Sequence, residues 1–405
     1  MNGLPGLLSF EVAVERLLAL ARPLAPERHP IATAANLYLA QDIRARLTRP
    51  PADLSAMDGY ALRFADLPGP LRLVGESAAG RPLAATIGAG ETARIFTGAH
   101  LPAGADTVAV QEDAVVDGLL VSFPQSGPPE AGAHIRRRGI DFGEGELLAR
   151  AGDRLGPARL GLVAAAGIAE VAVHRPPRVG ILSTGDELVA PGTLPLSNQI
   201  VGSNGLMIAA LLQGLGAEVT DFGIVADDRA VLADAIAAAR AYDLLVTIGG
   251  ASVGDHDLVK PVLQALGADI DFWRVAIRPG KPLLAGRLAP QAGATMVVGL
   301  PGNPVSAFVC ARLFLAPVLR ALAGNPAPHD SFSTAQTTTP LAANGARRQF
   351  LRATLAVGPA GPKITAALAQ DSSLLSVLAG ADALLVRPEH APAAAAGDAV
   401  PMLSL

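Results

Sequence analysis

Glycine-rich and acidic stretches follow successive apolar runs in the second half of this 405-residue chain. The clearest is "TIGGASVGDHD" (247–257), which has the pattern of a strand, a glycine-rich loop and the start of a helix. Exposed amides and the positive end of a helix dipole favour an anion at such a loop. Asp255 and Asp257 in the same loop would repel one. A divalent cation between the carboxylates and a phosphate removes the conflict, because Mg²⁺ is commonly held by carboxylates together with substrate phosphates.

Each neighbouring apolar run ends in a similar way, in "STGDE" (183–187), "VADD" (225–228) and "GLPGNP" (299–304). Helix caps and tight turns explain any one of these alone, but not an acidic or glycine-rich end on every strand. The pattern predicts one crevice for a phosphorylated ligand and a divalent cation. Its amides would come from Gly249, Gly250, Ser252 and Gly254, and its carboxylates from Glu187, Asp227, Asp228, Asp255 and Asp257. The strand ends add Ser183, Thr184, Gly185, Pro301, Gly302 and Asn303. His256, between two acids, is more typical of a surface residue than of a metal ligand.

Two cations flank a Pro-Gly turn in "FWRVAIRPGKPLLAG" (272–286). The prolines that follow Arg278 and Lys281 hold both residues extended, so we expect a stiff loop that presents two positive charges. Fixed cations suit an oxyanion. A solvated turn would explain this stretch alone, and the neighbouring phosphate and carboxylate groups make that explanation weaker.

The elements that would position these residues form an α/β domain. From residue 178 the pattern alternates between strands and helices, which is typical of βαβ units and a mostly parallel sheet. Ligands of such sheets bind beyond the carboxyl ends of the strands, where the motifs lie. We therefore predict a multidomain α/β fold, because 405 residues exceed the size of one hydrophobic core.

The remaining segments predict three further parts. An amphipathic helix begins near Ser9, residues 51–144 carry short β-type runs between Gly/Pro clusters, and the last ~80 residues again have strand-like pieces. We predict an N-terminal helical and linking region (1–50, completed by 145–176), a β-rich inserted domain (51–144), the α/β domain (177–325) and a small C-terminal β domain (326–405).

Composition excludes several classes of protein. A net charge of −4 with scattered basic residues argues against a nucleic-acid partner. The apolar excess is mostly alanine, no uncharged run approaches ~18 residues, and the N-terminus lacks a secretory pattern, so we expect no membrane span and a cytoplasmic protein. The single cysteine, Cys310, falls in an apolar helical pattern, which favours a core residue over a nucleophile.

The ordered motifs resemble those of a known family. "SAMDGYAL", "TGAHLPAGADTV", "RRRGIDFGEGE", "STGDEL", "GIVADD", "TIGGASVGDHD", "RPGKP" and "GLPGNPVSA" occur in the order and approximate spacing of the molybdopterin molybdenumtransferase family, which includes bacterial MoeA and the E domain of gephyrin. The resemblance runs from about residue 8 to residue 322. It implies molybdenum insertion into adenylated molybdopterin with release of AMP, in a divalent-cation-dependent step, with molybdate as co-substrate.

The same resemblance implies roles for individual residues. Asp58, Thr97 and Asp141 match the family's functional positions in the β-rich and linking segments, although their local sequence alone is typical of turns. Glu187, Asp228, Asp257, Lys281 and Pro301 match those of the α/β domain, and Ser372 and Ser373 match more loosely. Arg278 departs from the many relatives that carry lysine there. Arginine and lysine are not interchangeable at a tight oxyanion site.

The resemblance also implies partners and leaves alternatives open. Family members are homodimers whose active site combines the α/β domain of one subunit with the β-rich domain of the other. A molybdopterin adenylyltransferase and cofactor-accepting molybdoenzymes or their chaperones are the implied protein partners. The alternative functions are adenylylation of molybdopterin, on a similar α/β core, and a non-catalytic molybdopterin-binding scaffold.

Overall fold

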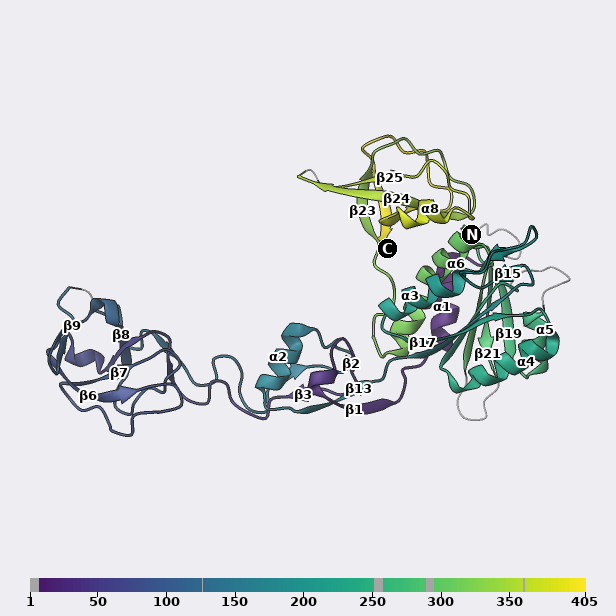
Figure 1. The fold of residues 1–405 in the computed structure, drawn as a ribbon. Helices are drawn as coiled ribbons and strands as arrows, with labels where there is room; N and C mark the ends of the chain where they lie inside the picture. Colours follow the sequence, from purple (N-terminus) through teal and green to yellow (C-terminus); the bar gives the residue numbers. More distant parts are fainter. Residues whose placement is uncertain (1–6, 126, 251–257, 289–294, 360) are drawn as a thin grey trace. The chain divides into compact units, whose positions relative to one another are not determined.

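The computed structural model describes residues 7–125, 127–250, 258–288, 295–359 and 361–405 (Figure 1). The chain forms two compact units. The first contains Met1–Glu27, Asn36–Ala40 and Val173–Leu405, and the second contains Arg28–Ala35 and Gln41–Ala172. We call the second the β-rich unit. Each is described by itself.

The β-rich unit is built on a 6-stranded sheet of order β8-β5-β7-β6-β10-β9. Its strands are β5 (Gly59–Leu62), β6 (Leu71–Ser77), β7 (Glu91–Ile95), β8 (Thr107–Val110), β9 (Val115–Asp117) and β10 (Leu120–Ser122). Alternate residues of β5 face two small cores, because Tyr60 and Leu62 belong to one cluster and Ala61 to another. Shorter elements complete the unit: β3 (Ile43–Arg44), β4 (Leu54–Ser55), β11 (Ile135–Arg136), β12 (Leu147–Ala149) and α2 (Pro157–Ala165).

A further 3-stranded sheet has the order β1-β13-β2. Its strands are β1 (Pro26–Pro30), β13 (Glu170–His174) and β2 (Tyr38–Leu39). After β13 the chain enters the α/β domain, where Arg175 donates to both carboxylate oxygens of Asp243 at 2.7 Å. This ion pair is mostly buried, and it fixes the chain at the start of the domain.

The α/β domain has a 6-stranded sheet of order β17-β14-β18-β22-β21-β19. The first four strands in that order are parallel, while β21 pairs antiparallel with both β22 and β19. The predicted multidomain α/β fold with a mostly parallel sheet is therefore confirmed. The strands are β14 (Arg178–Thr184), β17 (Glu218–Val225), β18 (Leu244–Ile248), β19 (Asp269–Arg274), β21 (Pro282–Arg287) and β22 (Met296–Leu300), beside a short pair β15 (Leu188–Val189) and β16 (Ile200–Val201).

Helices pack on both faces of this sheet (Figure 1). One layer contains α1 (Phe10–Leu20), α3 (Asn204–Gly214), α6 (Pro304–Cys310) and α7 (Ala316–Leu322), and the other contains α4 (Arg229–Ala238) and α5 (Val259–Ala265). Successive strand residues face opposite layers, so Val246 packs in the first cluster and Leu245 in the second. Helix α1 begins at the N-cap Ser9 and ends at Leu20, three residues before Pro23, which disfavours helix in the residue before it.

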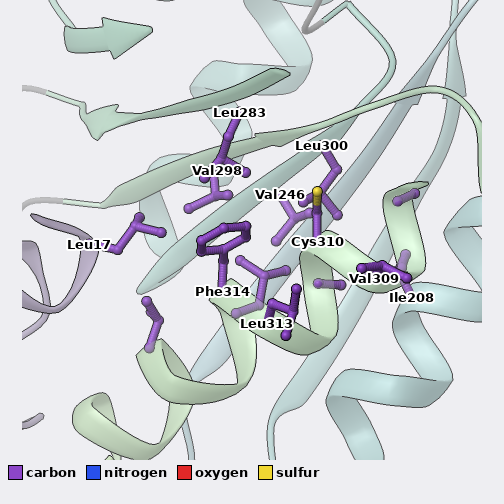
Figure 2. Packing of buried hydrophobic residues seen from close by; sticks show 14 of the residues in the cluster. Leu17, Ile208, Val246, Leu283, Val298, Leu300, Val309, Cys310, Leu313 and Phe314 are labelled. Carbon is purple, nitrogen blue, oxygen red and sulfur yellow. The ribbon is translucent and has the colours of Figure 1, made fainter. Parts of the chain in front are cut away.

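Figure 2 shows how the larger core closes around Phe314, with Leu17 of α1, Val298 of β22 and Cys310 nearby. Cys310 is fully buried, and burial raises the pKa of its thiol well above the usual value. The predicted core role of this cysteine is confirmed. Pro304–Leu322, which includes a π-helical turn at Ala311–Leu315, is long and apolar enough to cross a membrane, but 78% of it is buried in the protein interior, as in a core helix of a soluble protein.

The C-terminal domain is a small barrel. Its sheet has the order β20-β24-β25-β23-β27-β26, and an additional pairing of β24 with β26 closes it. The elements are β20 (Ile277–Arg278), β23 (Ser333–Thr337), β24 (Arg348–Gly358), β25 (Gly361–Ala366), α8 (Leu375–Ala379), β26 (Ala383–Arg387) and β27 (Ala399–Ser404). The prediction of a small C-terminal domain made of β-strands is confirmed.

Candidate active site

A cavity of about 790 Å³ opens at the carboxyl ends of the parallel strands. Four strands deliver residues to it: β14, β17, β18 and β22. The predicted residues that line it are Ser183, Thr184, Gly185, Glu187, Asp227, Gly249, Gly250, Lys281, Pro301, Gly302 and Asn303. We call this cavity the crevice. Its position is the one that open parallel sheets use for ligands.

The end of β14 supplies both hydroxyl and carboxylate groups. Ser183 and Thr184 are mostly buried, and the Thr184 hydroxyl donates to Asp227 Oδ1 in a short hydrogen bond. A Cβ atom at Gly185 would lie 2.6 Å from Glu187 Oε2, so glycine lets that carboxylate fold back over the turn. Hydroxyl, amide and carboxylate groups are thus held together on one side of the crevice.

The two aspartates after β17 have different surroundings. Asp227 lines the crevice, and its backbone amide donates to Asp186 Oδ1 at 3.1 Å. Asp228 is the N-cap of α4, where its Oδ1 accepts from Ala230 N at 2.8 Å and Val231 N at 3.0 Å. Such capping stabilises a helix whatever else the side chain does. Asp228 is not among the described residues that line the crevice.

The turn after β18 requires its glycines. Gly249 has φ +88°, and a Cβ atom there would lie 2.5 Å from the Thr184 carbonyl oxygen. Gly250 also has a positive φ, +62°. Residues with side chains rarely adopt this conformation. The predicted Ser252, Gly254, Asp255, His256 and Asp257 lie outside the described residues. In the part of the chain that is described, three or more potential metal ligands gather nowhere.

The loop after β22 leads into α6 and also contacts the C-terminal domain. Asn204 Nδ2 donates to the Gly302 carbonyl at 2.6 Å, and Asn303 Nδ2 donates to Ser372 Oγ at 3.2 Å. Ser373 lines the crevice, and its hydroxyl and amide both donate to Asp371 Oδ1, which lowers the pKa of Asp371. Ser372 and Ser373 therefore lie at or beside the crevice. Sequence reasoning gave no role to Asn204 or to Ser306, which also line it.

The predicted Pro-Gly turn between Arg278 and Lys281 is present as residues 279–281, and it joins two strands, so Arg278 itself lies in a strand and not in the loop. Arg278 ends β20, which pairs with β24, and Pro282 is the first residue of β21. A proline is tolerated at the first position of a strand, so the Pro-Gly turn did not exclude a sheet edge. Lys281 and Pro282 line the crevice, whereas Arg278 is exposed and is not among the described lining residues.

Gly280, between these cations, packs against the core. It has φ +97°, and a Cβ atom there would lie 2.3 Å from Cys310 Sγ. The Cys310 thiol also donates to the Gly280 carbonyl, with Sγ 3.4 Å from the oxygen. The buried cysteine therefore supports the turn that carries Lys281.

Asp58, Thr97 and Asp141 belong to the β-rich unit, whereas the crevice belongs to the other unit. Asp58 Oδ1 accepts from the Thr97 amide at 2.7 Å and from its hydroxyl at 2.9 Å. These bonds, the amide first, lower the pKa of Asp58. Asp141 Oδ2 lies 3.3 Å from Arg49 Nε, and both side chains are about half exposed.

Close packing against the neighbouring strand explains why the "DGY" motif has glycine at position 59. A Cβ atom at Gly59 would lie 1.9 Å from the Ala109 carbonyl oxygen of the adjoining strand β8. Asp58 directly precedes Gly59, the first residue of β5. The motif is thus more than the turn that local sequence alone favours.

Three family models match the chain in succession. They are the MoeA N-terminal region (domain I and II) over residues 8–167, a probable molybdopterin binding domain over residues 180–321, and the MoeA C-terminal region (domain IV) over residues 334–405. Together they span nearly the whole chain, including the C-terminal segment that resembled the family only loosely.

Individual relatives agree. The molybdopterin molybdenumtransferase of Haemophilus influenzae is 39% identical, over 78% of each chain. Molybdopterin molybdenumtransferase 2 of Mycobacterium tuberculosis is 37% identical, over 95% of this chain and 96% of its own. The crystal structure of a molybdopterin biosynthesis MoeA protein of Pyrococcus horikoshii matches with a TM-score of 0.81 and 30% identity, over 98% of this chain and 99% of its own. This chain is therefore a member of the MoeA family of molybdopterin molybdenumtransferases.

Proposed function

We propose that this chain inserts molybdenum into adenylated molybdopterin and releases AMP, which completes the molybdenum cofactor. The observation that supports this most is the crevice, where glycine amides, carboxylates and Lys281 face one cavity in a member of the MoeA family. Carboxylates and a cation side by side suit a ligand that contains both a phosphorylated pterin and an oxyanion.

Each group has a role that follows from its chemistry. The amides around Gly249 and Gly250 donate to a phosphate, as amides in positive-φ turns commonly do. Lys281 provides a positive charge for molybdate, and its turn is supported by buried Cys310. Ser183, Thr184 and Asn303 offer polar groups that orient the pterin.

A divalent cation such as Mg²⁺ fits the crevice. Glu187 and Asp227 both line it, and carboxylate oxygens are the ligands that this hard cation prefers. Two carboxylates suffice when substrate phosphates and water complete the coordination. When bound, the cation would neutralise charge on the phosphate groups as AMP leaves. Asp228, Asp255 and Asp257 remain proposed cation ligands, and the family resemblance also proposes catalytic roles for Asp228 and Asp257.

A homodimer is part of the proposal. It would let Asp58, Thr97 and Asp141 of one subunit act at the crevice of the other. The adenylyltransferase and cofactor-accepting molybdoenzymes or their chaperones are proposed partners on the same ground, and a cytoplasmic location remains a prediction.

The direct test measures AMP release from adenylated molybdopterin by the purified protein with Mg²⁺, with and without molybdate. We expect molybdate-dependent release with molybdenum retained on the pterin. Lys281→Ala should lower the rate ~10²-fold, the typical cost of removing one preorganised electrostatic contact. Asp257→Ala should lower it similarly. Asp234→Ala is the matched control, because Asp234 is exposed on α4 and lies outside the crevice lining.

Other outcomes would point elsewhere. ATP consumption with molybdopterin and without molybdate would indicate an adenylyltransferase. That alternative is already weakened, because MoeA-type regions flank the α/β domain on both sides. Molybdopterin binding with no release of AMP would indicate a scaffold.

The dimer has its own test. Asp58→Ala and Lys281→Ala proteins, each strongly impaired alone, are mixed and allowed to exchange subunits. If each site uses both subunits of a symmetric dimer, about a quarter of the sites become intact and activity returns. A monomeric mass by light scattering, or no recovery despite exchange, would contradict the shared site.

A further inference from the structure

A second cavity, of about 450 Å³, lies at the opposite end of the α/β sheet from the crevice. It is bordered by the amino ends of β14 and β22 and by the chain that follows α1. Its lining includes five arginines and one carboxylate: Arg22, Arg175, Arg178, Arg240, Arg287 and Asp243. We call it the arginine cavity.

The nearby acids are committed to one of these arginines. Arg175 holds Asp243 through two bonds of 2.7 Å, and Glu27 Oε1 lies 3.8 Å from Arg175 Nε. Glu218 also acts electrostatically on Arg175. The second role of Asp243 is to accept the Arg178 backbone amide at 2.8 Å. The carboxylates near the cavity therefore interact mainly with Arg175.

The other four arginines have no carboxylate within ion-pair distance in the described part of the chain: Arg22, Arg178, Arg240 and Arg287. Like charges around one concave surface repel each other, and the low-dielectric walls strengthen the field inside. Such an arrangement raises the local concentration of anions. It costs free energy unless an anion offsets it.

Two of these guanidinium groups also have unused donors. Arg240 Nη2 donates to the Leu266 carbonyl at 2.9 Å, and Arg287 Nη2 donates to the Leu20 carbonyl. Both Nε atoms are buried and have no hydrogen-bond partner among the described residues. A buried donor without an acceptor is destabilising. The carbonyl bonds hold the two guanidinium groups in place, so their positive charges stay beside the cavity.

We propose that the arginine cavity binds a small, doubly charged tetrahedral oxyanion. A guanidinium presents a planar set of donors that matches the oxygens of such an anion, and several of them together favour two charges over one. Inorganic phosphate and molybdate share this chemistry. The proposal does not depend on the reaction in the crevice, because no residue lines both cavities.

The test is equilibrium dialysis of the full-length protein at low salt against labelled phosphate and, separately, labelled molybdate. Arg22→Glu and Arg178→Glu each reverse one charge at the cavity, and both side chains are exposed. Each should weaken binding of one oxyanion per chain about tenfold or more, since a hydrogen bond to a charged group is typically worth at least that factor. Lys281→Ala, in the crevice, should leave this binding unchanged.

Arg81→Glu is the matched control, because Arg81 is an exposed arginine of the β-rich unit and the variant has the same net charge. Equal weakening by Arg81→Glu would show a general charge effect and overturn the proposal. Absence of saturable binding of either anion in the Lys281→Ala protein would overturn it too.

Competition between phosphate and molybdate would support a general oxyanion site, and binding of only one of them would identify the occupant. Arg22 forms no hydrogen bond or ion pair with another side chain in the described part of the chain, so that variant tests the cavity even if Arg178→Glu fails to fold.

Discussion

Gly59 of the β-rich unit lies against a backbone carbonyl, whereas Gly280 of the α/β domain lies against a side chain. A Cβ atom at Gly59 would come within 1.9 Å of the Ala109 carbonyl oxygen, and one at Gly280 within 2.3 Å of Cys310 Sγ. Both glycines adjoin proposed functional residues, Asp58 and Lys281. The Ala109 carbonyl and the Cys310 side chain differ in how easily each can move or be removed.

The two regions therefore have different tolerance. The Ala109 carbonyl belongs to β8, which is paired with β5 on one side of the sheet, so it cannot move without breaking the pairing. The Cys310 side chain ends in a single sulfur atom, which a substitution can remove. The Asp58 corner is fixed by main chain, and the Lys281 turn is fixed by packing. Predictions that substitute each glycine test this difference.

The largest expected effect is that of Gly59→Ala. Overpacking in a well-packed interior typically costs 1–3 kcal/mol, and here the neighbour is paired backbone, so we expect about 3 kcal/mol of lost stability in the β-rich unit. Hydrogen exchange of the β5 amides should accelerate accordingly, while exchange in β14 of the other unit stays unchanged.

Gly161→Ala provides the matched control in the same unit. Gly161 is in α2, and a Cβ atom there would meet nothing within 4 Å. Alanine should stabilise that helix by about 0.5–1 kcal/mol. Slow exchange in β5 of the Gly59→Ala protein would show that the β5–β8 pairing can relax, and the contrast with Gly280 would fail.

Gly280→Ala should have the next largest effect. Two terms add: the contact with Cys310 Sγ, and the positive φ of +97°, which costs an L-residue roughly 1–2 kcal/mol. We expect about 2 kcal/mol of lost stability and, because the turn carries Lys281, a higher apparent KM for molybdate. Thermal unfolding and AMP release measure the two consequences separately.

The matching test adds Cys310→Ala. The double variant should regain the part of the loss that comes from the sulfur contact and keep the part that comes from φ, so the two substitutions should not be additive. Cys310→Ser, which retains a donor of similar size for the Gly280 carbonyl, should give no such rescue. Full additivity of Gly280→Ala and Cys310→Ala would show that packing against Cys310 does not hold this turn.

Sequence predicted the crevice better than it predicted the individual contacts within it. Strand–helix alternation fixes where parallel strands end, so Glu187, Asp227, Gly249 and Asn303 were expected at one edge, and all of them line the cavity. An aspartate after a strand can either cap the next helix or bind a ligand, and the sequence does not distinguish these roles. The structure shows that Asp228 caps α4.

Longer-range pairings could not be predicted. The pairing of β20 with β24 of the C-terminal barrel joins segments far apart in sequence, and the Pro-Gly turn between β20 and β21 concealed the strands on either side of it. The contact of Gly280 with Cys310, 30 residues away, depends on the packing of α6 against that turn. The fold class and domain order follow from local pattern, whereas these contacts depend on tertiary structure.

The smallest expected effect concerns Thr97 and Asp58. Both Thr97 donors lower the pKa of Asp58 from 3.8, and the backbone amide is the larger cause. Thr97→Val removes only the hydroxyl, so the pKa of Asp58 should rise part of the way back, as measured by carboxyl-carbon NMR titration. Thr97→Ser should leave it low. Because the folded pKa lies below the unfolded one, this contact stabilises the protein above pH 3.8 and is lost as the pH falls through the folded pKa. A return to 3.8 in Thr97→Val would mean that the side chain carries the whole interaction, and that the Asp58 corner is held by a removable group, as the Lys281 turn is.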